Sequence, residues 1–175
     1  EIAAIDNTFT KALNVSKFKD ELLNKFGKHY FNLIEMELRS FDPKIVELLK
    51  EENKLINKYN ALKASAAIEF NGETLNLTGL VPFKQDLNRD VRKKAFKATN
   101  DFFTKHEQEF DLIFDKLVKI RHKKASILGF KNFIPLGYLN MSRSDYGPKE
   151  VEEYRNQIIK YIVPIAEKIK EKRRK

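Results

Sequence analysis

Cysteine and tryptophan are absent from the 175 residues, while glycine occurs six times and proline five times. Without cysteine no disulfide can hold the fold, and catalysis by a thiol is excluded. The scarcity of glycine and proline predicts long regular elements with few tight turns. No apolar run approaches the ~20 residues of a transmembrane helix, and no signal peptide is visible. We therefore expect a cytoplasmic protein without a membrane partner.

Hydrophobic residues make up 42% of the chain and charged residues 34%, a balance typical of a folded, water-facing protein with one core. The formal charge of +9 allows two interpretations: an anionic partner such as nucleic acid, or a solvated surface of lysine-rich helices. Lysines alternate with Glu and Asp over most of the length, and the densest basic run, 168–175, lies at the C-terminus. We therefore favour solvated helices and expect no nucleic-acid partner.

Apolar residues recur at helical spacing over most of the chain. Gly27 predicts a kink or break within one of these helices, and Pro164 predicts a kink within another. The expected helices span residues 3–13, 17–39, 43–66, 89–105, 107–128, 132–140 and 148–175.

Helix start and stop signals support these boundaries. Ser16, Asp42 and Asn88 are residue types that accept hydrogen bonds from the first turn of a helix, and Pro43 suits the first helical position. Gly129 is a natural C-terminal stop.

One segment changes to the period of a β-strand. Residues 67–77 alternate apolar and polar side chains around Asn71-Gly72, a pair that suits the positive φ angles of a two-residue hairpin turn. Such a hairpin must pack on helices, because two strands alone are marginally stable. The sequence therefore predicts a mainly α fold: an array of long antiparallel helices with one β-hairpin (about 67–77). We expect residues 1–175 to form one helical domain or part-domain with no internal boundary.

His106-Glu107 resembles the start of a zinc-peptidase helix, in which a second histidine follows at the fourth position after the first. That position holds Phe110, whose phenyl ring cannot ligate zinc. With three histidines and no cysteine, we predict no metal site and no catalytic residue in this chain, and we interpret His106 as a surface or helix-end residue. Glu51 and Glu52 are interpreted as solvent-facing.

Residues 119–124 form a basic helical run that includes Arg121, His122 and Lys124. Such a run can grip phosphates, but it lacks the interleaved aromatic residues of single-strand binding proteins. An exposed helical face is the interpretation we favour.

Residues 128–146 are dense in aromatic residues and end in Arg-Ser-Asp-Tyr. The planar guanidinium of Arg143 suits a carboxylate, and Tyr138 and Tyr146 can hydrogen-bond a peptide backbone. The alternative is structural: Tyr146 packs under the turn, and Arg143 pairs with Asp145 or a nearby Glu. The chemistry of the residues alone favours this alternative.

The same segment carries a family resemblance. The stretches that carry it, in chain order, read FGKHYFNLIEMELRSFDPKIVELLKEENKL, ASAAIEFNGETLNL, DVRKKAFKATNDFF, FDLIFDKLVKIRHKKASILGF, LGFKNFIPLGYLNMSRSDY and IVPIAEKIKEKRRK. Together they resemble, in the same order, oligoendopeptidase F and Pz-peptidase-like enzymes of the thimet-oligopeptidase superfamily.

The resemblance implies a helical zinc metallopeptidase with a deep channel that admits short, unfolded peptides. Its zinc would sit on an HExxH helix C-terminal to these residues, so no catalytic residue is transferred to this chain. The chain starts without methionine and ends in a basic run without a helix stop, as expected of an internal fragment.

Three hypotheses follow for the function. In the first, the chain is an inactive part of the channel wall, with Arg143, Tyr138 and Tyr146 facing the substrate. In the second, it is a basic helical module that binds nucleic acid or an acidic protein. In the third, it is purely a scaffold. Its partners under the first hypothesis are short peptides and the remainder of its own polypeptide, and exposed apolar faces predict self-association of the fragment.

Overall fold

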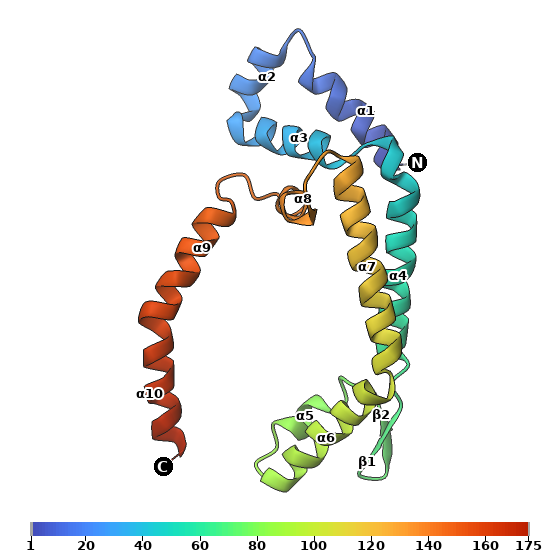
Figure 1. Cartoon of the computed structure of the whole chain (residues 1–175), viewed down its shortest axis with the longest axis vertical. Coiled ribbons are helices and arrows are strands. Elements are labelled where there is room, and N and C mark those ends of the chain that lie inside the picture. Colours follow the sequence, from blue (N-terminus) through green and yellow to red (C-terminus); the bar gives the residue numbers. More distant parts are fainter. Residues whose placement is uncertain (1, 175) are drawn as a thin grey trace. The chain divides into compact units, whose positions relative to one another are not determined.

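The computed structural model describes residues 2–174. Within that range the chain is mainly helical, with one two-stranded antiparallel sheet (Figure 1). The predicted fold class is confirmed. The chain divides into two compact units, Lys44–Ile127 and Glu1–Pro43 with Leu128–Lys175. The single domain or part-domain expected for 1–175 stays a prediction, because two compact units can belong to one domain.

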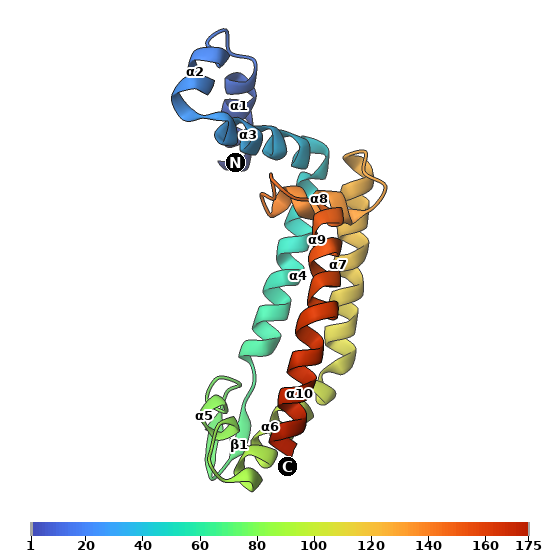
Figure 2. The same cartoon turned by 90° about the vertical axis from the view of Figure 1, so that its left-hand side faces the viewer.

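The first of these units, 44–127, is built on two long helices, α4 (Val46–Ala64) and α7 (Glu107–Ile127). They run antiparallel and side by side, as both views show (Figures 1 and 2). The helical segment begins at Pro43, as predicted, but its first turn is not α-helical, and the N-cap position of α4 itself is Ile45. The residues before it, Pro43–Ile45, form a 3₁₀ turn, η1, which is a common way for a helix to begin.

The hairpin consists of β1 (Ile68–Phe70) and β2 (Glu73–Leu75), with Ile68 opposite Leu75. Its two turn residues, Asn71 and Gly72, have φ angles of 53° and 84°. These positive values are those of the turn predicted from the Asn-Gly pair.

The hairpin packs on two helices, as a lone pair of strands must. These are α5 (Val81–Lys84) and α6 (Arg89–Lys105). Phe70, Leu80 and Ala95 are buried between them, and the rings of Phe70 and Phe83 lie 4.9 Å apart. Each large apolar side chain buried in this way stabilises the fold by roughly 1.5–3 kcal/mol.

Asn88 caps α6 as predicted. Its side-chain oxygen accepts a hydrogen bond of 2.9 Å from the backbone N–H of Asp90. The cap satisfies one of the donors that the first turn leaves without an intrahelical partner.

The second unit contains α1 (Ile2–Asn14), α2 (Lys19–Phe26), α3 (Lys28–Ser40) and α8 (Phe133–Asn140). Helix α3 packs against the other three. Phe31 and Ile34 on α3 and Leu136 on α8 are buried. These side chains supply the apolar core of this part of the unit.

Two sequence signals between α1 and α3 have different outcomes. Gly27 does break the predicted helix 17–39, because its φ of 86° is incompatible with a continuous right-handed helix. Ser16 is not the N-cap residue, since that position belongs to Phe18. The Ser16 hydroxyl instead accepts a hydrogen bond of 3.2 Å from the Phe18 N–H in the preceding turn.

The C-terminal rod, residues 148–174, is a continuous helical segment formed by α9 (Pro148–Gln157), η2 (Ile158–Ile162) and α10 (Val163–Arg174). It is drawn in red in Figure 1. The turn η2 is a π-helix, and it comes directly before the region of Pro164, whose missing N–H disturbs a regular ladder. Within residues 2–174, no helix has the length and apolar character to cross a membrane.

Candidate functional site

The turn after α8 brings Arg143 back to Tyr138. The Arg143 N–H donates a 3.2 Å hydrogen bond to the Tyr138 carbonyl, and the Met141 N–H donates to the Gly137 carbonyl at 3.1 Å. Ser142 closes the turn with a left-handed φ of 53°, a conformation that commonly ends a helix. The backbone therefore fixes where the Arg143 side chain starts.

The three residues proposed from the sequence, Arg143, Tyr138 and Tyr146, lie together. The guanidinium carbon of Arg143 lies over the Tyr138 ring at 4.9 Å and over the Tyr146 ring at 5.4 Å from the ring centres. Such cation–π contacts hold a guanidinium in place without neutralising its charge. Within residues 2–174, no carboxylate lies within 4.0 Å of the guanidinium nitrogens.

The ion pair with Asp145 that the sequence left open is therefore not formed among the described residues. The Asp145 carboxylate instead accepts a 3.1 Å hydrogen bond from the Ser144 hydroxyl. Tyr146 is exposed and does not pack under the turn. Contact of these side chains with a substrate stays a prediction.

A groove of about 490 Å³ opens beside Arg143 and Tyr146 and continues along α9. Its other lining residues are Glu150, Val151 and Tyr154, which sequence analysis missed. Their spacing is the signal that finds them: residues three and four apart share one face of a helix. This groove, defined by its five lining residues, is called the Arg143 groove below.

Glu150 is held at the start of α9. Its side-chain oxygen accepts a 2.7 Å hydrogen bond from the Gly147 N–H. That backbone hydrogen bond, aided by a second one from its own N–H, lowers the pKa of the Glu150 carboxyl. Glu150 is therefore ionised at neutral pH and places a negative charge on the wall of the Arg143 groove.

Ser144 also lies 3.5 Å from a ring nitrogen of His29, on α3. The set of Ser144, His29 and Asp145 contains the residue types of a hydrolytic triad but not its order. In a triad the carboxylate orients the histidine, and the histidine takes the proton of the serine. Here the carboxylate contacts the serine, so the arrangement lacks the contact that would orient a base.

His106 lies at the end of α6, as expected from the sequence. Its backbone N–H donates to the Phe102 carbonyl, and its ring packs 4.8 Å from the Phe102 ring. One nitrogen lies 3.6 Å from a Glu109 oxygen. Across residues 2–174, no three His, Asp or Glu side chains gather in a way that could hold a metal ion. The side chains around His106 therefore do not fit zinc, and no chemical step is assigned to a metal here.

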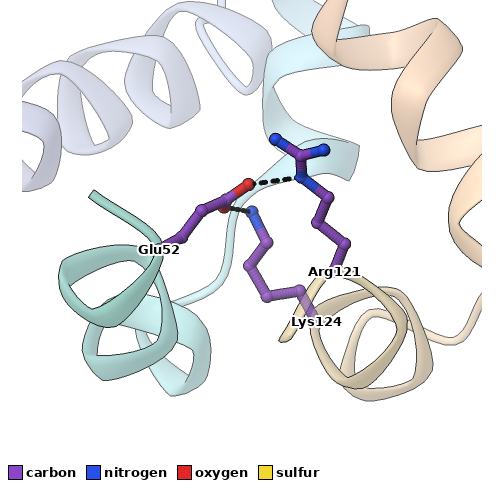
Figure 3. A network of polar contacts seen from close by, with 3 residues as sticks. All are labelled: Glu52, Arg121 and Lys124. Carbon is purple, nitrogen blue, oxygen red and sulfur yellow. Dashed lines mark hydrogen bonds and ion pairs between the residues drawn. The ribbon is translucent and has the colours of Figure 1, made fainter. Parts of the chain in front are cut away.

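Glu52 does not face solvent, contrary to the sequence interpretation. From α4 it reaches Arg121 and Lys124 on α7 (Figure 3). The Arg121 nitrogen lies 2.8 Å from one carboxylate oxygen, and the Lys124 ammonium contacts the other. Lys124 is buried, with 4% of its surface exposed. Two members of the basic run 119–124 are thus paired inside the protein and are not available to grip phosphates.

Burial of the Glu52 carboxylate raises its pKa, but the hydrogen bonds and charges of Arg121 and Lys124 outweigh burial, so the net pKa is lowered. The ionised carboxylate is the partner that the buried ammonium of Lys124 requires. This charge cluster joins α4 to α7.

A second hollow, of about 590 Å³, lies between α4, α6 and α7. Its walls are largely aromatic and aliphatic: Tyr59, Phe103, Phe110 and Phe114 are among the lining residues. The Tyr59 and Phe110 rings meet edge to face at 5.6 Å. The charged residues on its walls are Glu107, Asp111 and Arg121.

Comparison with known proteins gives the family. The family described as the peptidase M3 N-terminal domain matches residues 1–41. Pz peptidase A, solved with an inhibitor, is 46% identical and superposes on 99% of this chain with a TM-score of 0.95. Residues 1–41 thus match the M3 N-terminal domain, and nearly the whole chain is similar in sequence and fold to part of Pz peptidase A. The resemblance drawn from the sequence is confirmed.

Two further solved structures are similar to this chain to the same extent. A protein described as an oligoendopeptidase F from Bacillus anthracis strain Ames is 41% identical over 98% of this chain, with a TM-score of 0.94. Another described as an oligoendopeptidase F is 41% identical over 99%, with a TM-score of 0.95. The M3-like chain spans 31% of the length of each of these relatives. No protein in the curated set matches it.

Proposed function

We propose that this chain is a non-catalytic part of a zinc metalloendopeptidase that hydrolyses short oligopeptides, and that it supplies scaffold and part of the channel wall. The observation that carries the proposal is the superposition of 99% of the chain on 31% of Pz peptidase A. A segment that keeps its fold at 46% identity keeps the packing that its function needs. The chain contains no HExxH sequence, so the metal and the proton-transferring glutamate belong to other residues of the complete polypeptide.

The C-terminal rod supports a role inside a larger polypeptide. Large apolar side chains are exposed along it, among them Ile159, Tyr161, Ile162, Ile165 and Ile169. A contiguous apolar face on a helix is a packing surface that water does not favour. The remainder of an enzyme about three times as long is the partner of fitting size.

The Arg143 groove supports the role in the channel wall. It combines a guanidinium, two tyrosines that line it and an ionised carboxylate in one open depression. Peptide-binding surfaces commonly combine charged and aromatic groups that converge on a groove. We assign Arg143, Tyr138 and Tyr146 to contact with the peptide substrate.

The test compares peptide cleavage by the complete polypeptide and by residues 1–175 alone. The complete polypeptide is expected to cleave short unstructured peptides and to lose that activity when a chelator removes zinc. Residues 1–175 are expected to cleave none of them. Chelator-sensitive cleavage by the 1–175 chain, or a complete polypeptide inactive on every short peptide, would overturn the proposal.

The basic-module alternative has less support. Arg121 and Lys124 are paired with Glu52, while Lys97 and Lys119 are paired with Asp101 and Asp115. A phosphate-binding face needs a continuous surface of cations, and its affinity falls steeply with salt. Salt-sensitive binding of a DNA or RNA oligomer by residues 1–175 would revive this alternative.

A further inference from the structure

Arg143 is a cation that two tyrosine rings hold in place, and its N–H donors are open to a ligand. Its guanidinium lies over the rings of Tyr138 and Tyr146, and the side chain is half-buried. A guanidinium presents its N–H donors in the plane of the group, and its bidentate geometry matches a carboxylate. Among residues 2–174 no carboxylate lies within 4.0 Å of these donors, so they are open to a ligand.

The carboxylates close to Arg143 in sequence have other donors. Asp145 accepts from the Ser144 hydroxyl at 3.1 Å, and Glu150 accepts from the Gly147 N–H at 2.7 Å. Neither comes within 4.0 Å of the guanidinium nitrogens of Arg143. In the part of the chain that the structure describes, Arg143 is therefore oriented toward a groove with its charge uncompensated.

The volume and the lining residues of the groove suit the end of a peptide. Its volume of about 490 Å³ lies within the usual range for small-ligand sites. Val151 and the rings of Tyr146 and Tyr154 offer apolar surface to a side chain. The ionised Glu150 offers an acceptor to a peptide N–H or a basic side chain. One carboxylate, placed at Arg143, is the ligand that satisfies these groups together.

We propose that the Arg143 groove binds the carboxylate of a peptide substrate, and that the enzyme thereby prefers peptides bearing that group near the cleavage site. This inference rests on the proposed function, since it names the part of the substrate that the groove takes. The carboxylate can come from the C-terminus of the peptide or from an acidic side chain, and the experiment separates these sources.

The experiment measures kcat and KM of the complete polypeptide on four matched peptides. One peptide ends in a free acid, and its twin ends in an amide. Two further amidated peptides differ only in carrying Glu or Gln at one internal position. Equilibrium binding of the same four peptides, after the metal has been removed by a chelator, gives a readout that does not depend on cleavage.

The variants are Arg143→Gln and Arg143→Lys, with Arg155→Gln as the matched control. Arg155 is an exposed arginine on the same helix as Glu150 and does not line the groove. The wild type is expected to bind the preferred carboxylate peptide about 10–100-fold more tightly than its neutral twin, the usual effect of a charge-assisted hydrogen bond. The preference should appear in KM and binding, should vanish in Arg143→Gln, should fall in part in Arg143→Lys, and should persist in Arg155→Gln.

Preference for the free acid over the amide assigns the C-terminus, and preference for Glu over Gln assigns a side chain. Equal affinity of the wild type for acid and amide and for Glu and Gln overturns the inference without the need of any variant. A preference that survives Arg143→Gln overturns it as well. If Arg143→Gln does not fold, Tyr146→Leu replaces it, with a partial loss expected because one stacking face is removed. Failure of all peptide cleavage refutes the proposed function, whereas the binding titration still decides on the carboxylate.

Discussion

The hairpin with α5 and α6 encloses a buried apolar core of Phe70, Leu80 and Ala95, whereas large apolar side chains along the C-terminal rod are exposed. Leu80, at the centre of the first region, has 0% of its surface exposed, while Ile165 on the rod has 55% exposed. Both residues are large aliphatic side chains, so composition does not explain the difference. The difference is explained by the packing partners: Leu80 packs against other residues of the same chain.

The comparison teaches how this segment is divided between self-sufficient and dependent parts. The hairpin region and the α4–α7 pair hold their own core and charge cluster, and they should fold to the same structure in any context. The rod is helical by local pattern, and under the proposed function a surface of the remaining polypeptide covers its apolar side chains. The predictions below test this difference, from the largest expected effect to the smallest.

The largest effect is expected at Glu52. Glu52→Ala leaves the buried Lys124 ammonium without its counter-charge, and it should lower the unfolding free energy of the 1–175 chain by about 3–5 kcal/mol. Glu51→Ala, at an exposed neighbouring position, should change it by less than about 0.5 kcal/mol. Urea unfolding followed by circular dichroism measures both. Equal effects of the two substitutions would contradict the charge cluster.

At Leu80, truncation removes the centre of the hairpin core. Leu80→Ala should destabilise the chain by about 2–4 kcal/mol through lost burial and the cavity left behind. Leu87, which is 100% exposed, provides the control, and Leu87→Ala should be nearly neutral. A small effect at Leu80 in the same urea titration would mean that this region is not a self-sufficient core.

The Glu52 cluster should also impose a pH dependence. The folded pKa of Glu52 is lowered, so its contribution is complete above the unfolded pKa of about 4.3 and is lost as pH falls through the folded value. Glu52→Gln removes this contribution. The difference in unfolding free energy between wild type and Glu52→Gln should therefore be largest at neutral pH and shrink below about pH 4. If the difference in unfolding free energy instead grew as the pH falls, the predicted direction of the pH dependence would be contradicted.

Loss of the α6 cap should have a moderate effect. Asn88→Ala removes the acceptor for the Asp90 N–H and should destabilise the chain by about 1 kcal/mol. Asn100, exposed within the same helix, makes no cap, and Asn100→Ala should be neutral or slightly stabilising because alanine favours helix. Thermal unfolding of both variants under one condition compares them.

The smallest effect on the isolated chain is expected on the rod. Ile165→Lys should change the unfolding free energy of residues 1–175 by no more than about 0.5 kcal/mol, because the side chain has no partner there. The same substitution should weaken self-association of the chain in sedimentation velocity, and it should destabilise the complete polypeptide by several times more. Glu167→Lys, at a polar position of the same helix, should have neither effect.

Local signals in the sequence predicted most of the fold. Asn71-Gly72 has the turn conformation expected of that pair, Gly27 breaks a helix, and Asn88 caps one, because each effect depends on a few neighbouring residues. The helical segment predicted from residue 43 begins there, but its first turn is a 3₁₀ turn and α4 starts at Val46, since a 3₁₀ turn and an α-helix share their start signals.

Contacts between residues far apart in the chain could not be predicted from the sequence. Glu51 and Glu52 look alike in sequence, but only Glu52 meets Arg121 and Lys124, which lie 69 and 72 positions away. A helical pattern marks the face of a side chain but not the element that will cover it.

The candidate site was predicted in part. Tyr138, Arg143 and Tyr146 fall within one short segment, so their clustering followed from proximity in the chain. Glu150, Val151 and Tyr154 complete the groove because α9 begins directly after the turn, and its helical spacing carries them to the same side. The start of that helix agrees with the predicted span 148–175, but the conformation of the turn before it was not predicted.

Backbone hydrogen exchange, measured on residues 1–175 and on the complete polypeptide, tests the difference between the two regions most directly. Amides of α6 and the hairpin should be protected to a similar degree in both proteins. Amides of the rod should exchange quickly in the 1–175 chain and become strongly protected in the complete polypeptide. Equal protection of the rod in both proteins would contradict the account, because the rod would then need no partner beyond this chain.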